Sequence, residues 1–111
     1  MIRDDLVYVQ DIVESIEIIN DYVNAKSEKD FEESLMLQDA VYRRFEIIGE
    51  AAAKVSDAFK DAHPEIEWRL MKLMRNKLIH EYFGISATAV FATIIEDLPP
   101  LLAKIKLLLN Y

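Results

Sequence analysis

Turn-forming residues are scarce in this chain, and their scarcity restricts the fold more than any other feature. Two Gly and three Pro occur among 111 residues. A many-stranded β fold needs turn signals at short, regular intervals, whereas long helices need few connections. Neither strand-like alternation nor an internal repeat stands out. The sequence therefore predicts an all-α protein, and short connections between long helices favour antiparallel neighbours in an up-and-down helical bundle.

Apolar residues recur at spacings of three and four along much of the chain, which indicates helices with one buried face. The first such face begins at Leu6, and a later one contains Val41, Phe45 and Ile48. We expect four to five helices in a single domain over residues 1–111. The expected elements are helices over residues 5–24, 37–59 and 66–83, a short polar element after the capping pattern at Ser27, a helix capped by Ser86 or Thr88, and a last helix with Asp97 as N-cap and Pro99 in its first turn.

The composition is that of a folded chain, with 52% hydrophobic and 30% charged residues. Cysteine is absent, so disulfides, thiolate nucleophiles and cysteine–zinc sites are excluded. His, Asp and Glu show no convincing metal-ligand spacing, and we expect neither a metal nor a cofactor. The N-terminus lacks the profile of a signal peptide, and no apolar run approaches the roughly 18 residues that span a bilayer. These features predict a cytoplasmic protein without membrane contact.

The charge balance limits how the chain can meet nucleic acid. The formal net charge is −7, and broad, non-specific binding to nucleic acid relies on basic surfaces. Any contact with RNA must therefore be local and use a few Arg and Lys side chains.

Gly49 lies in the middle of the second long helix, where Gly costs roughly 1 kcal/mol relative to Ala. Close approach by another helix would explain it; the alternative is that the Gly is merely tolerated. Arg43, Glu46 and Glu50 follow one another at spacings of three and four. They can lie along one polar edge of the helix, where intrahelical ion pairing is the ordinary explanation. The sequence does not show whether the two Glu face a site or the solvent.

The segment from Arg75 to Tyr82 holds the candidate site, because it places a guanidinium, an imidazole and a phenol near the end of one expected helix. At about 100° per residue, Arg75 and Tyr82 project within roughly 20° of each other. His80 lies about 140° round from Arg75 but close to Asn76, four residues before it. One helix therefore does not direct Arg75 and His80 at the same atom. Either a distorted helix end lets them converge, or a two-fold dimer assembles a composite site.

Each of these residues also has an ordinary structural explanation. His80 can cap the helix or compensate its dipole, Arg75 can form a solvated ion pair, and Tyr82 can be an aromatic at the edge of the core. His63 precedes a Pro and is expected in a loop, and Trp68 is expected in the core.

The order Arg75, four residues, His80, one residue and Tyr82 resembles the Arg-X4-His-X-Tyr motif of HepT proteins, which are small helical domains of the HEPN superfamily. The resemblance covers essentially the whole chain, although relatives often carry Pro where this chain has Glu67. The other matching segments are Leu37-Gln38-Asp39-Ala40-Val41, Glu46-Ile47-Ile48-Gly49-Glu50-Ala51, Trp68, the run from Met74 to Gly84, and Asp97-Leu98-Pro99.

This resemblance implies a homodimeric, metal-independent endoribonuclease that acts as the toxin of a type VII toxin–antitoxin pair. Arg75 and His80 correspond to the ribonuclease pair, and Asn76 to a supporting polar residue. The antitoxin, MntA, is a minimal nucleotidyltransferase that transfers AMP from ATP to the motif tyrosine, here Tyr82. An AMP there would add bulk and negative charge on the face of the helix that carries Arg75.

The residue types suit this chemistry. RNA can be cut by its own 2′-OH attacking the neighbouring phosphate, and His80 could transfer the proton. Arg75 could hold the phosphate and stabilise the transition state, while Asn76 could orient His80 or the substrate. The alternative hypothesis is a non-catalytic helical partner or nucleotide-binding scaffold of a minimal nucleotidyltransferase, which the acidic balance favours. A helical oligomer whose motif is only structural is a third possibility.

Overall fold

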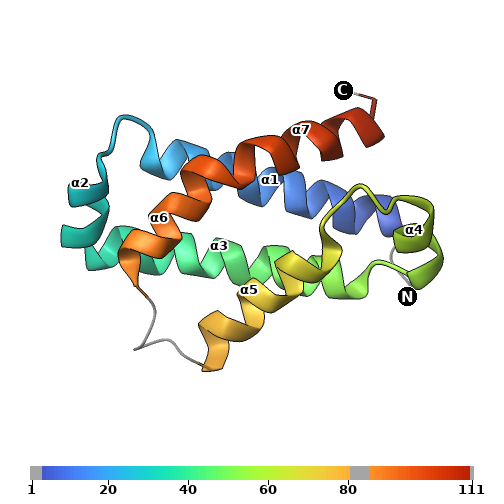
Figure 1. The fold of residues 1–111 in the computed structure, drawn as a ribbon, viewed down its shortest axis with the longest axis horizontal. Coiled ribbons are helices and arrows are strands. Elements are labelled where there is room, and N and C mark those ends of the chain that lie inside the picture. The colour runs from blue at the N-terminus through green and yellow to red at the C-terminus, as the bar shows by residue number, and fades with distance from the viewer. Residues whose placement is uncertain (1–3, 81–85, 111) are drawn as a thin grey trace.

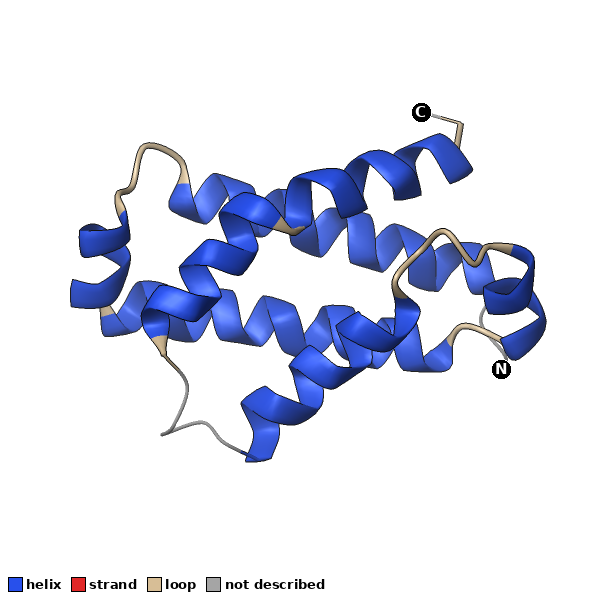
Figure 2. Cartoon of the chain, viewed as in Figure 1, coloured by secondary structure: helices blue, strands red, loops and turns tan. Residues whose placement is uncertain are grey.

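The computed structural model describes residues 4–80 and 86–110, without the side chains of residues 78–80. Within these ranges the chain forms seven α-helices and no strand, which confirms the expected all-α bundle (Figures 1 and 2). The number exceeds the expected four to five because two short helices, α2 and α4, stand apart from the long ones. The helices are α1 (Asp5–Val23), α2 (Glu28–Glu33), α3 (Leu35–Lys54), α4 (Asp57–Ala62), α5 (Trp68–His80), α6 (Ala87–Glu96) and α7 (Leu98–Leu108).

Helix α3 is the central element of the bundle. It runs antiparallel to α1 and packs against α5 with its other side (Figure 1). Helices α6 and α7 follow each other across the bundle, where α6 contacts α2 and α7 contacts α1. The segment of interest to function, α5, is therefore held mainly by α3.

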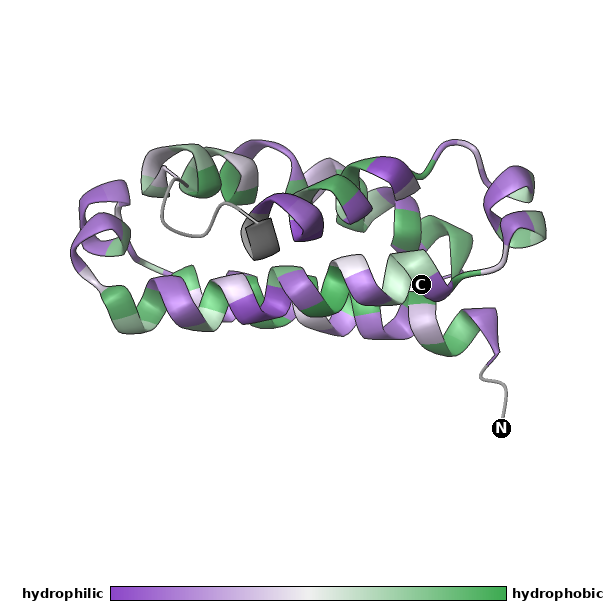
Figure 3. Ribbon diagram, turned by 90° about the horizontal axis from the view of Figure 1, so that it is seen from below, coloured by the Kyte–Doolittle hydropathy of each residue, from purple (hydrophilic) through white to green (hydrophobic). Residues whose placement is uncertain are grey.

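The core consists of the apolar stripes that the spacing predicts, and Figure 3 shows apolar and polar segments alternating along the helices. Val41, Phe45 and Ile48 of α3 are all buried, at 2% exposure or less. Leu6 is 48% exposed, so its assignment to the buried face of α1 is wrong. It lies in the first turn of α1, at the end of the bundle (Figure 1).

A second prediction is also wrong: the helix expected over residues 37–59 ends at Lys54, and α4 begins at Asp57. Ser56 separates the two helices, and its Oγ accepts a hydrogen bond from the Phe59 backbone N–H at 3.2 Å. The Ser56 backbone N–H and Oγ donate to the Asp5 carboxylate at 2.8 and 2.7 Å. These hydrogen bonds lower the pKa of Asp5 below its ordinary value, and they fix the break between α3 and α4 at the start of α1.

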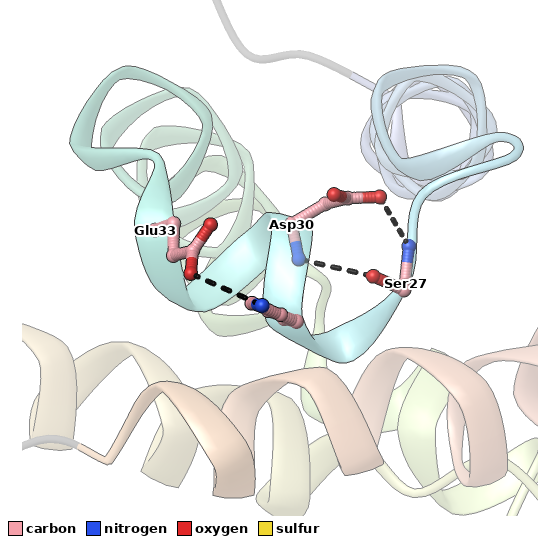
Figure 4. A network of polar contacts seen from close by, with 4 residues as sticks. Ser27, Asp30 and Glu33 are labelled. Carbon is pink, nitrogen blue, oxygen red and sulfur yellow. Dashed lines mark hydrogen bonds and ion pairs between the residues drawn. The ribbon is translucent and has the colours of Figure 1, made fainter.

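Most of the predicted helix caps are confirmed. Ser27 and Asp30 form a reciprocal capping box at the start of α2, next to the ion pair of Glu33 (Figure 4). Ser86 caps α6 by accepting from the Ala89 backbone N–H. Asp97 does occupy the N-cap position of α7, but its backbone is helical and its side chain makes no capping hydrogen bond. The predicted N-cap position of Asp97 is therefore confirmed, but the predicted capping hydrogen bond is absent. The reason is that α7 follows α6 almost without interruption, which keeps Asp97 in helical geometry.

The start of α5 is fixed by aromatic packing. Trp68 is 8% exposed, as expected for a core residue, and its Nε1 donates to the His63 carbonyl at 3.0 Å. Phe59 lies between the two, with ring centroids 4.6 Å from His63 and 6.1 Å from Trp68. His63 ends α4 in the connection to α5, which confirms the predicted loop position. The predicted helix end at Phe83 lies outside the described residues.

Candidate active site at the contact between α3 and α5

Gly49 of α3 lies directly against Arg75 of α5. A Cβ added to Gly49 would lie 2.1 Å from the Arg75 Cβ, 2.9 Å from its Cγ and 3.0 Å from the Met71 carbonyl oxygen. Real Cβ atoms do not approach backbone or Cβ atoms so closely. Of the two explanations for Gly49, close approach by another helix is therefore confirmed, and the residue that approaches is the candidate catalytic Arg.

The Arg75 guanidinium is held by its neighbour in sequence. The Arg75 Nε and Nη2 atoms donate to the Asn76 side-chain oxygen at 3.2 and 2.9 Å. Both residues are half-buried. The Arg75 side chain is thus held at both ends, with its Cβ against Gly49 and two of its five N–H donors on one acceptor.

The other two predicted site residues follow Arg75 along the chain. The backbone of α5 continues through His80, one helical turn beyond Asn76. The His80 side chain and all of Tyr82 lie outside the described residues. The structure thus brings Arg75, Asn76 and Gly49 together, and the pairing of Arg75 with His80 stays a prediction.

Two of the three residues along the polar edge of α3, Arg43 and Glu46, form an ion pair. Arg43 Nη1 lies 3.5 Å from a Glu46 carboxylate oxygen, with side-chain exposures of 61% and 34%. The ordinary explanation given for these two residues is therefore confirmed. Glu50, which follows Gly49, is half-buried. Glu46 is thus paired with Arg43 along the helix, and the contacts of Arg75 with Gly49 and Asn76 involve neither Glu.

A surface groove between α4 and α5, here called the α4–α5 groove, ends at the candidate site. It has a volume of about 690 Å³, and Asn76 is one of its lining residues. The charged side chains of the lining are Lys60, Asp61, Glu67, Arg69 and Lys72.

The α4–α5 groove was not predicted, although part of its signal is visible in the sequence. Arg69, Lys72 and Asn76 follow at spacings of three and four, which puts them on one face of α5. Lys60 comes from α4, and only the packing around Trp68 brings it near that face.

In the part of the chain that the structure describes, no group of three or more His, Asp or Glu side chains is placed to hold a metal ion. No helix in residues 4–80 or 86–110 has the length and apolar content to cross a membrane.

Comparison with known proteins identifies the family of this chain. The family model described as "Ribonuclease HepT-like" matches residues 12–108. "Probable ribonuclease HepT" of Thermococcus cleftensis is 44% identical over 97 residues, which cover 87% of this chain and 88% of that protein. No solved structure matches the chain significantly.

Two further relatives carry RNase names. The "Gamma-glutamylcyclotransferase and putative RNase" of Methanocaldococcus jannaschii is 40% identical over 105 residues, which cover 95% of this chain but 47% of that longer protein. A "Putative RNase" of Caldanaerobacter subterraneus subsp. tengcongensis is 34% identical over 103 residues, covering 93% of this chain and 92% of that protein. With a family match over most of its length and relatives of this similarity, the chain belongs to the HepT-like ribonucleases of the HEPN superfamily.

Proposed function

We propose that this chain is an endoribonuclease that cuts RNA without a metal ion, with Arg75 and His80 as its catalytic residues. The observation that carries the proposal is the placement of Arg75, whose Cβ lies against Gly49 and whose guanidinium is held by Asn76. Helix α5 continues from there to His80. The family of the chain and the names of its relatives support the same class of reaction.

In this reaction a ribose 2′-oxygen attacks the adjacent phosphorus, and the bond from that phosphorus to the 5′-oxygen of the next nucleotide breaks. The products are a 2′,3′-cyclic phosphate and a 5′-hydroxyl. His80 takes the proton of the 2′-OH or gives one to the leaving 5′-oxygen. Arg75 binds the non-bridging oxygens and stabilises their added negative charge. Since the Asn76 oxygen is engaged with Arg75, its amide NH₂ is the end that can meet substrate.

A homodimer completes the site in this proposal. Arg75 and His80 are separated by about 140° around one helix, so one copy does not direct both side chains at one phosphate. Two copies related by a two-fold axis, with the ends of α5 facing each other, would pair Arg75 of one copy with His80 of the other. Each dimer would then hold two equivalent sites.

The proposal includes control by adenylylation of Tyr82, seven residues after Arg75 in the sequence. In this proposal the chain is the toxin of a type VII toxin–antitoxin pair, and its antitoxin is an MntA-type nucleotidyltransferase. The Tyr82 oxygen attacks the α-phosphorus of ATP, AMP becomes bound to the tyrosine and pyrophosphate leaves. The helical spacing of the sequence predicts Tyr82 on the face that carries Arg75, so the AMP phosphate would compete with RNA for that guanidinium.

The alternative is a non-catalytic partner or nucleotide-binding scaffold of a nucleotidyltransferase, which the net charge of −7 favours. A cleavage assay separates the two. Labelled single-stranded RNA is incubated with the purified chain in EDTA, and the product ends are identified. The ribonuclease predicts cleavage that leaves 2′,3′-cyclic phosphates, and the scaffold predicts intact RNA.

Two histidines provide a matched pair of variants for this assay. His80→Ala should abolish cleavage, whereas His63→Ala should retain it, because His63 lies in the α4–α5 connection and packs on Phe59. Cleavage that survives His80→Ala would show that the active site has been assigned to the wrong residue.

A further inference from the structure

We propose that the α4–α5 groove binds the RNA backbone beside the bond that is cut; this inference rests on the proposed ribonuclease function. Its phosphate ligands are Lys60, Arg69 and Lys72. Asn76 joins the groove to the active site, because it lines the groove and also holds the Arg75 guanidinium.

The charge of the groove differs from that of the whole chain. The lining contains three basic side chains, Lys60, Arg69 and Lys72, and two carboxylates, Asp61 and Glu67. The chain as a whole has 20 acidic and 13 basic residues, so an excess of basic side chains at one place runs against its composition. Moreover, Lys104 of α7 lies 4.0 Å from a Glu67 oxygen and compensates part of the charge of that carboxylate. The groove therefore offers the local basic surface that an acidic chain needs in order to bind a polyanion such as RNA.

The basic residues of the groove also lie in line with His80 along α5. Arg69, Lys72 and Asn76 lie on one face of α5, and His80 takes the next position in the same register, four residues beyond Asn76. Along the helix axis, Lys72 lies about 12 Å and Arg69 about 16 Å from His80. These two cations are thus too far along the helix to bind the phosphate at His80, and they are placed for phosphates farther along the same strand.

The lining favours contact with phosphates over contact with bases. Trp68 is 8% exposed, and its Nε1 is occupied by the His63 carbonyl. Phe59 packs edge-on against its ring at 6.1 Å. An indole buried in this way does not offer a face on which a base can stack. Binding through the groove should consequently depend on salt and little on RNA sequence.

The test measures RNA binding as a function of salt, in a His80→Ala background that keeps the RNA intact. The groove variant carries Lys60→Gln, Arg69→Gln and Lys72→Gln, and the probe is a short fluorescein-labelled single-stranded RNA of mixed sequence. Losing three phosphate contacts should reduce the slope of log Kd against log salt by about 2. Between about 50 and about 200 mM salt, the loss of affinity should then be roughly 20-fold smaller than in the parent.

A control variant with the same change in net charge carries Lys26→Gln, Lys29→Gln and Lys106→Gln. Lys29 belongs to α2 and Lys26 precedes that helix in the sequence. Helix α2 lies at the end of the bundle opposite α4 (Figure 1), and Lys106 pairs with Glu17 on α1. This variant should keep the parent slope. Equal slopes for the groove and control variants would overturn the proposal.

A second variant, with the opposite expected effect on RNA binding, keeps the proposal testable if the groove variant fails to fold. Asp61→Asn with Glu67→Gln removes both carboxylates of the lining and should tighten RNA binding; unchanged or weaker binding would overturn the proposal. If the groove variant still bound RNA but no longer bound an MntA-type nucleotidyltransferase, the groove would be a protein-binding surface, and the proposal would fail. Cleavage is assayed separately in the chain with His80 intact. Failure of the groove proposal would therefore not contradict the proposed ribonuclease activity.

Discussion

The Cβ of Arg75 lies 2.1 Å from the position that a Cβ on Gly49 would occupy. The residue that places α3 against α5 and the residue proposed to bind the scissile phosphate are therefore in direct contact. The position of the guanidinium depends on the absence of a side chain at Gly49, and a substitution there should affect folding and catalysis together.

Gly49→Ala should lower the free energy of unfolding. Ala would gain about 1 kcal/mol from helix propensity, but its methyl group overlaps the Arg75 side chain and forces the helices apart, and such overpacking typically costs 1–3 kcal/mol or more. We expect a net loss of up to about 2 kcal/mol in urea denaturation and a lower kcat. Ala53→Leu, an addition of bulk at an exposed position of the same helix, should be nearly neutral. An increase in stability for Gly49→Ala would contradict the close contact.

Asn76 should act through Arg75. Asn76→Ala removes the acceptor for the Arg75 Nε and Nη2 atoms, so the guanidinium loses its fixed orientation. We expect kcat to fall by about 10–100-fold with little change in the midpoint of thermal unfolding. Asn76→Asp keeps an acceptor but adds a negative charge, so it should mainly raise the KM for RNA. Wild-type kinetics in both variants would exclude a positioning role.

The Asp5–Ser56 contact should make stability depend on pH in the acidic range. Hydrogen bonds from Ser56 lower the pKa of Asp5 in the folded state, whereas Asp in an unfolded chain has a pKa of about 3.9. A lowered folded-state pKa means that the contribution is fully present above the unfolded-state pKa and is lost as the pH falls through the folded-state pKa. The stability difference between wild type and Asp5→Asn should therefore shrink below about pH 4.

Ser56→Ala provides the control for that experiment. It removes the Oγ donor to Asp5 and the cap of α4, so part of the pH-dependent difference should disappear in a double-mutant cycle. A difference that is the same at all pH values, with or without Ser56, would show that this contact does not stabilise the fold.

Much of the fold can be predicted from the sequence, because apolar spacing reports which helix face is buried. The stripe of Val41, Phe45 and Ile48 is an example. The end of α3 could not be predicted, because Ser56 is bound by Asp5, 51 residues away, and local patterns do not contain such contacts. The exposure of Leu6 has a similar cause, since the spacing does not show where the neighbouring helices end.

The candidate site could be predicted in part. The motif and its register mark Arg75 and Asn76, but helical spacing cannot show that the Asn76 oxygen binds the guanidinium. The spacing also left two explanations for Gly49, and only the packing of α5 on α3 decides between them. The α4–α5 groove needs Lys60 from a different helix, which is information that the periodicity of α5 does not contain.

Adenylylation should occur at one tyrosine. Incubation with an MntA-type nucleotidyltransferase and ATP should add a single AMP to Tyr82, as located by peptide mass spectrometry, and the modified chain should no longer cleave RNA, since the AMP phosphate competes for Arg75. Tyr82→Phe should stay unmodified and remain active. Tyr42 serves as the comparison within the same chain: it is 5% exposed, and it should therefore stay unmodified. Modification of another tyrosine, or full activity of the AMP-bearing chain, would contradict this means of control.

The central claim is that Arg75 of one copy and His80 of another form one ribonuclease site, and a mixture of two inactive variants tests it most directly. Arg75→Ala and His80→Ala are each assayed alone and after refolding together in equal amounts. With random pairing, half of the dimers are mixed and each mixed dimer has one intact site, so about a quarter of the wild-type cleavage rate should return. A mixture that contains mixed dimers by native mass spectrometry but stays as inactive as its components would contradict the claim.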